Sequence, residues 1–100
     1  MVERFRVRID ADHVVRLWGE LDHAEATALA EVAASSVDTQ RELVVDLTDL
    51  TFIDSAGIGV IVETARLTDG DVLLRGPRPA VRRVLDVTGI VGTTGIKLEQ

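Results

Sequence analysis

The period of the apolar positions changes along the chain, and each change marks an expected element of secondary structure. Residues 5–9 alternate apolar side chains with arginines, which predicts a strand near a sheet edge with one buried and one solvated face. A turn at Asp10-Ala11-Asp12 leads to a more apolar strand over residues 13–18, which Gly19 ends. The first two strands are therefore expected to form a hairpin.

The stretch from Leu43 to Leu67 is the part around which the rest of the chain is organised. Its start, Leu43-Val44-Val45-Asp46-Leu47, predicts a short strand buried on both faces, as in a parallel sheet. A turn-rich connection follows, and from Ile58 apolar residues recur at the i, i+3, i+4, i+7 spacing of a helix with one packed face. The connection meets the helix at Asp54-Ser55-Ala56-Gly57, where backbone N–H groups need a capping acceptor.

A further helix is predicted before this stretch. Asp22-His23-Ala24-Glu25 resembles a capping box, in which Asp22 caps the helix and Glu25 reaches back to the N–H of the cap. The apolar stripe expected to face the sheet consists of Leu29, Val32, Ala33 and Val37.

The last third of the chain predicts a strand, a helix and a final strand. Asp69-Gly70 is a turn signal before the buried strand Val72-Leu73-Leu74, which completes a βαβ unit. Pro79 lies near the start of the helix and Gly89 just past its end. The inward-facing residues of this helix are expected to be Val81, Val84 and Leu85, and the final strand is expected at residues 96–98.

The predicted elements follow the order β-β-α-β-α-β-α-β, which indicates an α/β fold with one mixed β-sheet and packed α-helices. The sequence has 100 residues and shows no repeat, linker or shift in composition. It therefore predicts a single domain over residues 1–100.

Composition narrows the classes of function. Cysteine is absent, which excludes disulfides and thiolate metal sites and fits a reducing compartment. No apolar run approaches the roughly 20 residues that cross a bilayer, and no signal-peptide core follows Met1, so a cytoplasmic protein without direct membrane binding is expected. A net charge of −6 argues against nucleic-acid binding, since the phosphate backbone demands a basic surface.

The cations are almost all arginines, with Lys97 as the only lysine. Arg78, Arg82 and Arg83 cluster late in the chain. A solvated helix face is the favoured explanation of this cluster, and pairing with an acidic partner surface is the other.

Sequence signatures of metal and nucleotide sites are incomplete. Asp10, Asp12 and His13 could surround a cation, but no further ligands follow at a recognised spacing, so turn chemistry is favoured. Gly57-Ile58-Gly59 resembles the start of a dinucleotide loop, yet Val62 stands in place of the third glycine. The phosphate-loop pattern ending Gly-Lys-Ser/Thr is absent, so ATP binding by this chain is not expected.

The residue types of a Ser-His-Asp hydrolase are present in Ser55, His13 or His23, and Asp46. Ser55 lacks the G-x-S-x-G elbow, and nothing in the sequence supports a nucleophile-base geometry. The chain is therefore expected to be no enzyme and to hold no cofactor and no metal.

Two interpretations of Ser55 stay open. In one, Asp54 or Ser55 simply caps the helix. In the other, Ser55 is a modifiable hydroxyl, and a phosphate on it would add about −1.5 to −2 charges that a helix N-terminus could accept. Asp54 would repel that phosphate, so modification is expected to alter surface charge strongly without necessarily reshaping the fold.

Three ordered motifs carry a resemblance to a known family. Asp54-Ser55-Ala56-Gly57-Ile58-Gly59-Val60, preceded by an apolar strand, resembles the central motif of STAS domains, in which Asp-Ser-Ser/Thr-Gly-Leu-Gly-Val opens a helix. Gly19-Glu20-Leu21-Asp22-His23 and the segment Pro79 to Ile90 agree with the same family. The motifs extend over roughly the whole chain, which is identified as a member of the STAS family of anti-sigma factor antagonists.

This resemblance implies a protein-interaction switch. The implied partner is an anti-sigma factor serine kinase of the GHKL type, which supplies the ATP, binds the unphosphorylated chain and releases it after phosphorylating Ser55. A serine phosphatase is a second implied partner. Asp22 matches the acidic residue that lies beside the phosphorylatable serine and contacts the partner. The implied partner-binding residues are Asp22, Asp54, Ser55, Ala56, Gly57, Ile58 and Gly59, with an exposed Ile58 side and glycines that permit close approach.

The sequence departs from the family in two places. Ala56 stands where many switching members have Ser or Thr, which keeps open a second function, that of an unphosphorylated adaptor subunit of a transporter or a stress-signalling assembly. Family members usually continue into a final helix that this sequence does not show, so a partner contact made by that helix is not expected here.

Overall fold

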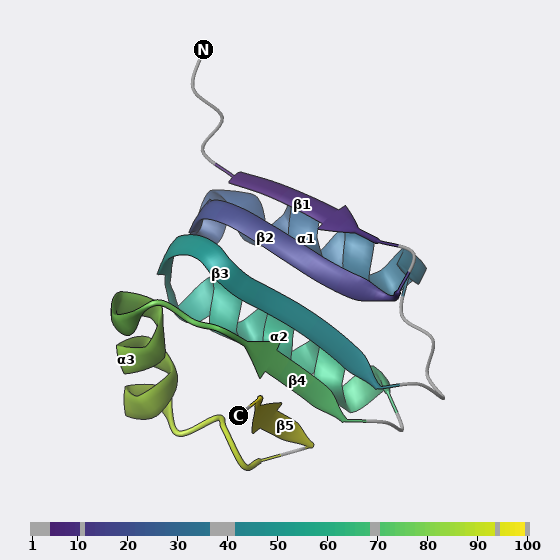
Figure 1. Cartoon of the computed structure of the whole chain (residues 1–100). Helices are drawn as coiled ribbons and strands as arrows, with labels where there is room; N and C mark the ends of the chain where they lie inside the picture. Colours follow the sequence, from purple (N-terminus) through teal and green to yellow (C-terminus); the bar gives the residue numbers. More distant parts are fainter. Residues whose placement is uncertain (1–4, 11, 37–41, 69–70, 94, 100) are drawn as a thin grey trace.

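Five strands form one mixed sheet, and strands that are neighbours in the sheet are also successive along the chain. The structure, a computed structural model, describes residues 5–10, 12–36, 42–68, 71–93 and 95–99. The elements in chain order are β1 (Phe5–Ile9), β2 (Val14–Leu21), α1 (His23–Ser36), β3 (Leu43–Ile53), α2 (Ser55–Leu67), β4 (Val72–Arg75), α3 (Pro79–Thr88) and β5 (Ile96–Leu98) (Figure 1). The α/β class and the order of elements are as predicted.

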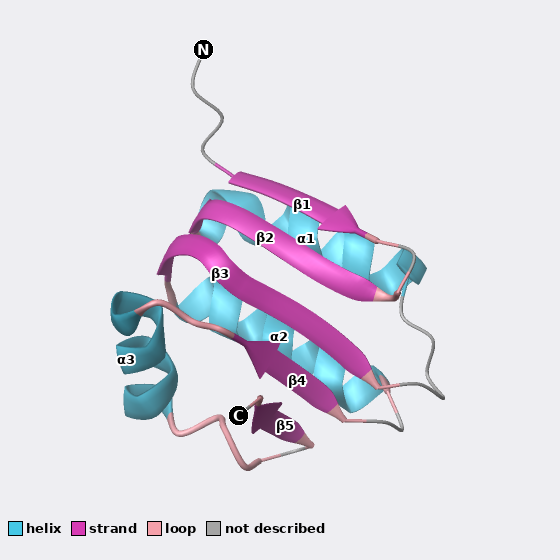
Figure 2. Cartoon of the chain, viewed as in Figure 1, coloured by secondary structure: helices cyan, strands magenta, loops and turns pink. Residues whose placement is uncertain are grey.

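The sheet has the strand order β1-β2-β3-β4-β5. β1 pairs antiparallel with β2, which confirms the hairpin and the edge position of β1, and every other neighbouring pair is parallel. Helices α1 and α2 lie side by side on one face of the sheet, and α1 also packs against β1 and β2 (Figure 1). Within the described residues, no helix covers the opposite face of β1 and β2 (Figure 2).

The core lies between the sheet and its helices. Of the stripe predicted for α1, Leu29 is buried and Val32 and Ala33 are half-buried, whereas Val37 lies outside the described residues. Val81 and Leu85 of α3 are fully buried, as predicted. The other fully buried large side chains come from the strands and are Leu17, Leu21, Leu47, Leu50, Ile53, Val72, Leu74 and Ile96.

β3 is longer than predicted, since it continues to Ile53 instead of ending near Leu47. β3 contains two bulges. In the first, three residue steps of β3, from Asp46 to Asp49, lie opposite two steps of β2, and the second bulge follows Leu50. Because each bulge inserts an extra residue, the apolar positions 47, 50 and 53 recur every three residues, and the period of two that marks a strand is lost. The predicted turn-rich connection is therefore a bulged strand.

Two smaller corrections concern the strands. β2 does not end at Gly19 but runs on to Leu21, and Gly19 takes a positive φ of 86° next to the bulge, a conformation open to glycine. The prediction that β3 is buried on both faces is wrong at Val44, which is only half-buried, because it points away from α1 and α2.

One prediction about charged residues is confirmed, and another stays a prediction. The carboxylate of Asp10 organises the β1–β2 turn, because its Oδ1 accepts from the N–H groups of Asp12 (3.0 Å) and Val14 (3.1 Å). All three side chains of the late arginine cluster are exposed, and Arg78 precedes α3 as its N-cap, so a solvated face stays the favoured explanation. The turn predicted at residues 69–70 lies outside the described residues. No helix in the described ranges is long and apolar enough to cross a membrane.

Candidate functional site

Two strand-to-helix junctions lie side by side at one end of the sheet. Leu21 at the end of β2 pairs with Ile53 at the end of β3, and in each case an aspartate follows and a helix begins. The Asp54 N–H donates to the carbonyl oxygen of Leu21 (3.2 Å), which fixes one junction against the other. The parallel pairing of β2 and β3 thus brings Asp22 and Ser55 into adjacent turns.

Asp54 holds both junctions with one carboxylate. Its Oδ1 accepts from the N–H groups of Ala56 (3.0 Å) and Gly57 (3.2 Å), at the start of α2. Its Oδ2 accepts from the N–H of His23 (3.0 Å), the first residue of α1. We call these three hydrogen bonds the Asp54 bridge. The N-cap of α2 is therefore Asp54 and not Ser55.

Asp22 caps α1 in the same way. Its Oδ1 accepts from the N–H of Glu25 (3.1 Å), and its carbonyl oxygen accepts from the N–H groups of Glu25 (3.1 Å) and Ala26 (3.0 Å). The predicted cap is thus confirmed, whereas the return of the Glu25 side chain stays a prediction. Asp22 as a residue is half-buried.

Ser55 is the first residue of α2, and its side chain is exposed. Because Asp54 supplies the cap, the Ser55 hydroxyl is not needed to begin the helix. Within the described part of the chain, no hydrogen bond engages this hydroxyl. The oxygen is therefore open to a reagent from solvent.

Gly57 and Ile58 correct the expectation of an exposed surface. Ile58 is 7% exposed and belongs to the core, so the prediction of an exposed Ile58 side is wrong. Gly57 is also buried, and a Cβ added there would lie 2.8 Å from side-chain atoms of both Ile53 and Leu21. This glycine permits a close approach, but the approach is that of α2 to the ends of β2 and β3.

A groove opens beside Ser55 between α1 and α2. It has a volume of about 320 Å³ and runs along α2 from Ala56 past Gly59 to Leu67, which is 56% exposed. The side contributed by α1 is lined by Ala30, Ala33 and Ala34. Gly59 is exposed, and a Cβ there would meet no atom within 4 Å, so a partner has free access to it.

Phe52 is a site candidate that sequence reasoning missed. It lies on β3 two residues before Asp54, and 46% of its surface is exposed. An exposed aromatic side chain is typical of a protein-binding surface, and Phe52 lies three residues before Ser55 in the chain. The signal was hidden because this part of the chain was predicted to be a turn. We define the Ser55 surface as Asp22, Phe52, Asp54, Ser55, Ala56 and Gly59.

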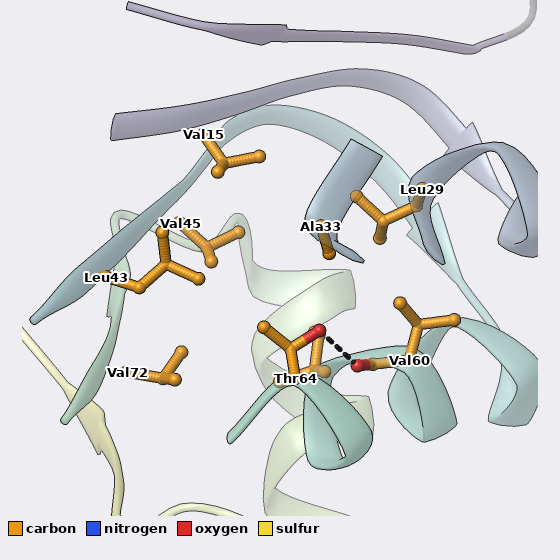
Figure 3. Close-up of a pocket in the computed structure, with 9 residues that line it drawn as sticks. Val15, Leu29, Ala33, Leu43, Val45, Val60, Thr64 and Val72 are labelled. Carbon is orange, nitrogen blue, oxygen red and sulfur yellow. Dashed lines mark hydrogen bonds between the residues drawn. The ribbon is translucent and has the colours of Figure 1, made fainter. Parts of the chain in front are cut away.

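The interior of the protein contains a second, much smaller space. Figure 3 shows this cavity of about 20 Å³ between the sheet and the two helices, lined by apolar side chains of both. The Thr64 hydroxyl donates to the carbonyl oxygen of Val60 (2.8 Å), as the dashed line in Figure 3 marks. The cavity has room for about one water and offers almost no polar partner, so a ligand site is better sought on the surface.

The hydrolase constellation is not assembled, although His23, one of its two candidate bases, starts α1 beside the junction that carries Ser55. His13 belongs to the β1–β2 turn before β2 begins, whereas Ser55 follows the far end of β3. Asp46 points to the face opposite the helices and accepts from Arg16 Nη1 (2.7 Å). Burial would raise the pKa of Asp46, but hydrogen bonds from Thr48 and the positive charge of Arg16 hold it below its ordinary value. Asp46 is thus the carboxylate of an ion pair.

Comparison with known proteins shows the family of the chain. The sequence model of the STAS domain family matches residues 4–98. The chain belongs to this family. The STAS domain is 30% identical over 94 residues to the anti-sigma F factor antagonist of Paenibacillus polymyxa, covering 84% of this chain and 80% of that protein. It is 32% identical over 82 residues to the anti-sigma F factor antagonist of Lysinibacillus sphaericus, covering 77% and 70%.

A solved structure extends the likeness to the fold. The crystal structure of an anti-sigma factor antagonist from Mycobacterium paratuberculosis matches this STAS domain with a TM-score of 0.81 and 27% identity, over 93% of this chain and 85% of that one. The family predicted from the three motifs is confirmed, and the STAS domain belongs among the anti-sigma factor antagonists.

Proposed function

We propose that this STAS domain is a phosphorylation-controlled antagonist that binds an anti-sigma factor serine kinase of the GHKL type through the Ser55 surface. The unphosphorylated form binds, and phosphorylation of Ser55 releases the kinase. A serine phosphatase would return the protein to its binding form. The domain itself acts as a substrate and a binding partner and not as an enzyme.

The observation that carries this proposal is that Asp54, and not Ser55, caps α2. Asp54 caps α2 and joins it to α1, which leaves the neighbouring hydroxyl exposed on a rigid element. The kinase can transfer the γ-phosphoryl group of its ATP to Ser55 Oγ, with ADP as the leaving group and the hydroxyl proton passing to a base of the kinase. Transfer leaves the Asp54 bridge in place, so the fold tolerates it.

The release follows from charge and solvation. The N–H groups of His23, Ala56 and Gly57 are already bound to Asp54, so a phosphate finds these donors occupied. It adds about −1.5 to −2 charges beside the carboxylates of Asp22 and Asp54. An interface fitted to a small hydroxyl would have to bury this charge, and the desolvation cost weakens the complex.

The test is incubation of the domain with its candidate kinase and ATP, followed by intact-mass and binding measurements on the same sample. We expect a single phosphate on Ser55 and loss of binding. Ser55→Ala should bind the kinase without release, and Ser55→Asp should bind more weakly. Ser35→Ala, which removes another exposed serine from α1, is the matched control and should behave as the parent.

Asp22→Ala separates capping from partner contact. Loss of the cap costs about 0.5–2 kcal/mol of stability, so binding is compared at a temperature where both proteins are folded. Equal binding would show that Asp22 is only a cap.

The second candidate function is that of an unphosphorylated adaptor subunit, which the alanine at position 56 supports. This function is favoured if the kinase adds no phosphate while a non-kinase partner binds both Ser55 variants stably.

A further inference from the structure

β1 leaves one edge of the sheet open. It is the terminal strand, and β2 is its only strand neighbour among the described residues. The Asp10 N–H donates to the carbonyl oxygen of Val14 (3.0 Å), so by the alternation of an antiparallel ladder Val7 and Ile9 direct their N–H and C=O groups away from β2. An extended segment can therefore hydrogen-bond along this edge.

The same strand presents two arginines to the face that no described helix covers. Arg6 and Arg8 are exposed, and the Arg6 guanidinium lies 4.3 Å from the centroid of the Trp18 ring. Arg16 on β2 is neutralised by both Asp10 (3.2 Å) and Asp46 (2.7 Å). No ion pair joins Arg6 or Arg8 to a carboxylate of the described residues. Two unneutralised cations in a chain of net charge −6 thus lie side by side with an aromatic ring.

The other face of β1 is apolar. Val7 and Ile9 are half-buried and pack against the core, so their outer sides lengthen the apolar surface at the sheet edge. The edge therefore offers a cationic row on one face, an apolar row on the other and backbone groups between them.

We propose that β1 is a second interaction surface, which binds an acidic polypeptide segment in extended conformation as an added strand. The carboxylates of that segment lie against Arg6 and Arg8, and apolar side chains at the alternate positions lie beside Val7 and Ile9. β2 separates this surface from β3 and from Ser55, so the two surfaces can be occupied at the same time.

Charge complementarity favours an acidic segment at this edge over a second copy of the chain or a nucleic acid. A second copy of the chain paired through β1 would place arginines of both copies next to one another on one face, and like charges across strands repel. A nucleic acid would meet the net charge of −6. An acidic strand gains both the ion pairs and the main-chain hydrogen bonds.

Trp18 provides a direct reporter, since the chain has one tryptophan and no tyrosine. The probe is a short peptide that alternates glutamate with valine and threonine, and its counterpart carries lysine in place of glutamate. We expect the glutamate peptide to change Trp18 emission in a saturable manner, with an affinity that falls as salt is added. The lysine peptide should cause no saturable change.

Arg6→Glu/Arg8→Glu should weaken peptide binding about tenfold or more, measured by calorimetry because Arg6 itself contacts the reporter ring. The matched control is Arg66→Glu/Arg83→Glu, which changes the net charge equally at exposed positions of α2 and α3. It should bind as the parent does. Val7→Pro removes an outward N–H from the edge without removing a β1–β2 hydrogen bond, and it should also weaken binding.

Several outcomes would overturn the proposal. They are absence of binding at about 1 mM peptide, equal affinity for the two peptides, and equal affinity of the Arg6/Arg8 variant and its control. A dimer in sedimentation that is lost in Val7→Pro, without peptide binding by the parent, would assign the edge to a second copy. None of these measurements involves kinase or phosphate, so their failure is distinct from failure of the proposed switch.

Discussion

Gly57 and Gly59 lie two residues apart in α2, but Gly57 is buried and Gly59 is exposed. Gly57 has its Cα against Leu21 and Ile53, whereas Gly59 faces open solvent beside the groove. Sequence reasoning assigned both to a partner surface. The apolar spacing from Ile58 to Ala65 already placed that side of the helix on the sheet, and packing against the sheet decides the environment of Gly57 and Ile58.

Alanine substitutions at these glycines should therefore have opposite effects. Gly57→Ala forces a methyl group into side chains of the core and should cost about 1–3 kcal/mol. Gly59→Ala meets nothing and removes the helix penalty of glycine, so it should raise the free energy of unfolding by up to about 1 kcal/mol. Urea denaturation measures both. If Gly57→Ala is neutral, the close packing of α2 on the strand ends is not as described.

The same Gly59 variant also probes the Ser55 surface. If the Gly59→Ala protein is more stable but binds the proposed kinase less well, the partner approaches this part of the groove closely. Unchanged binding would remove Gly59 from the interface and leave the rest of the Ser55 surface to carry it.

At the scale of elements, the Asp54 bridge ties two helices that are far apart in sequence. Sequence reasoning predicted a cap at each helix, because caps are local and have a recognisable pattern. It did not predict the bond from His23 to Asp54, because that contact depends on the parallel pairing of β2 with β3. Local signals predicted the two caps, and tertiary pairing joined them.

Variants of Asp54 should separate the two halves of the bridge. Asn keeps one oxygen for the Ala56 and Gly57 N–H groups but presents an amide nitrogen toward His23. We therefore expect Asp54→Asn to speed hydrogen exchange of the His23 amide and to leave the Ala56 and Gly57 amides close to the parent. Asp54→Ala should expose all three amides and cost about 1–3 kcal/mol.

The control for this comparison is Asp22→Ala, which acts on the Glu25 amide and leaves the Asp54 bridge in place. Equal protection of the His23 amide in the Asp54→Asn variant and the parent would mean that α1 does not depend on the second oxygen of Asp54.

Most strands and helices were predictable from apolar periodicity, and β3 shows why one was not. Its first half follows the pattern of a buried strand, but its bulges place Leu50 and Ile53 at a spacing that no regular strand has. A bulge is fixed by pairing with β2, which a single sequence does not display. The same limit hid Phe52, whose exposure follows from its place on the bulged strand.

At the scale of the whole molecule, charged side chains on the uncovered sheet face make stability depend on pH. Burial would raise the pKa of Asp46 and of Asp10, but hydrogen bonds and Arg16 outweigh burial, so both pKa values lie below the ordinary 3.8. A carboxyl group whose pKa is lower in the folded state favours folding when ionised. This contribution is present above the unfolded pKa and is lost as the pH falls through the folded one.

The free energy of unfolding should accordingly decrease as the pH falls below about 3.8. Asp46→Asn lacks the ionised group and should be less stable than the parent at pH 7, by a margin that narrows in acid. Urea denaturation at a series of pH values measures this margin. A margin that stays constant from neutral pH to strong acid would show that the ion pair with Arg16 does not stabilise the fold.

The order of strands has a consequence for the synthesis of the protein. After β1, every strand is laid down beside the one made just before it, so each new βα unit finds its docking edge already present as the chain emerges from the ribosome. The Asp54 bridge draws all its donors from residues 23–57. The donors and the acceptor of the Asp54 bridge are therefore complete while α3 and β5 are still being translated.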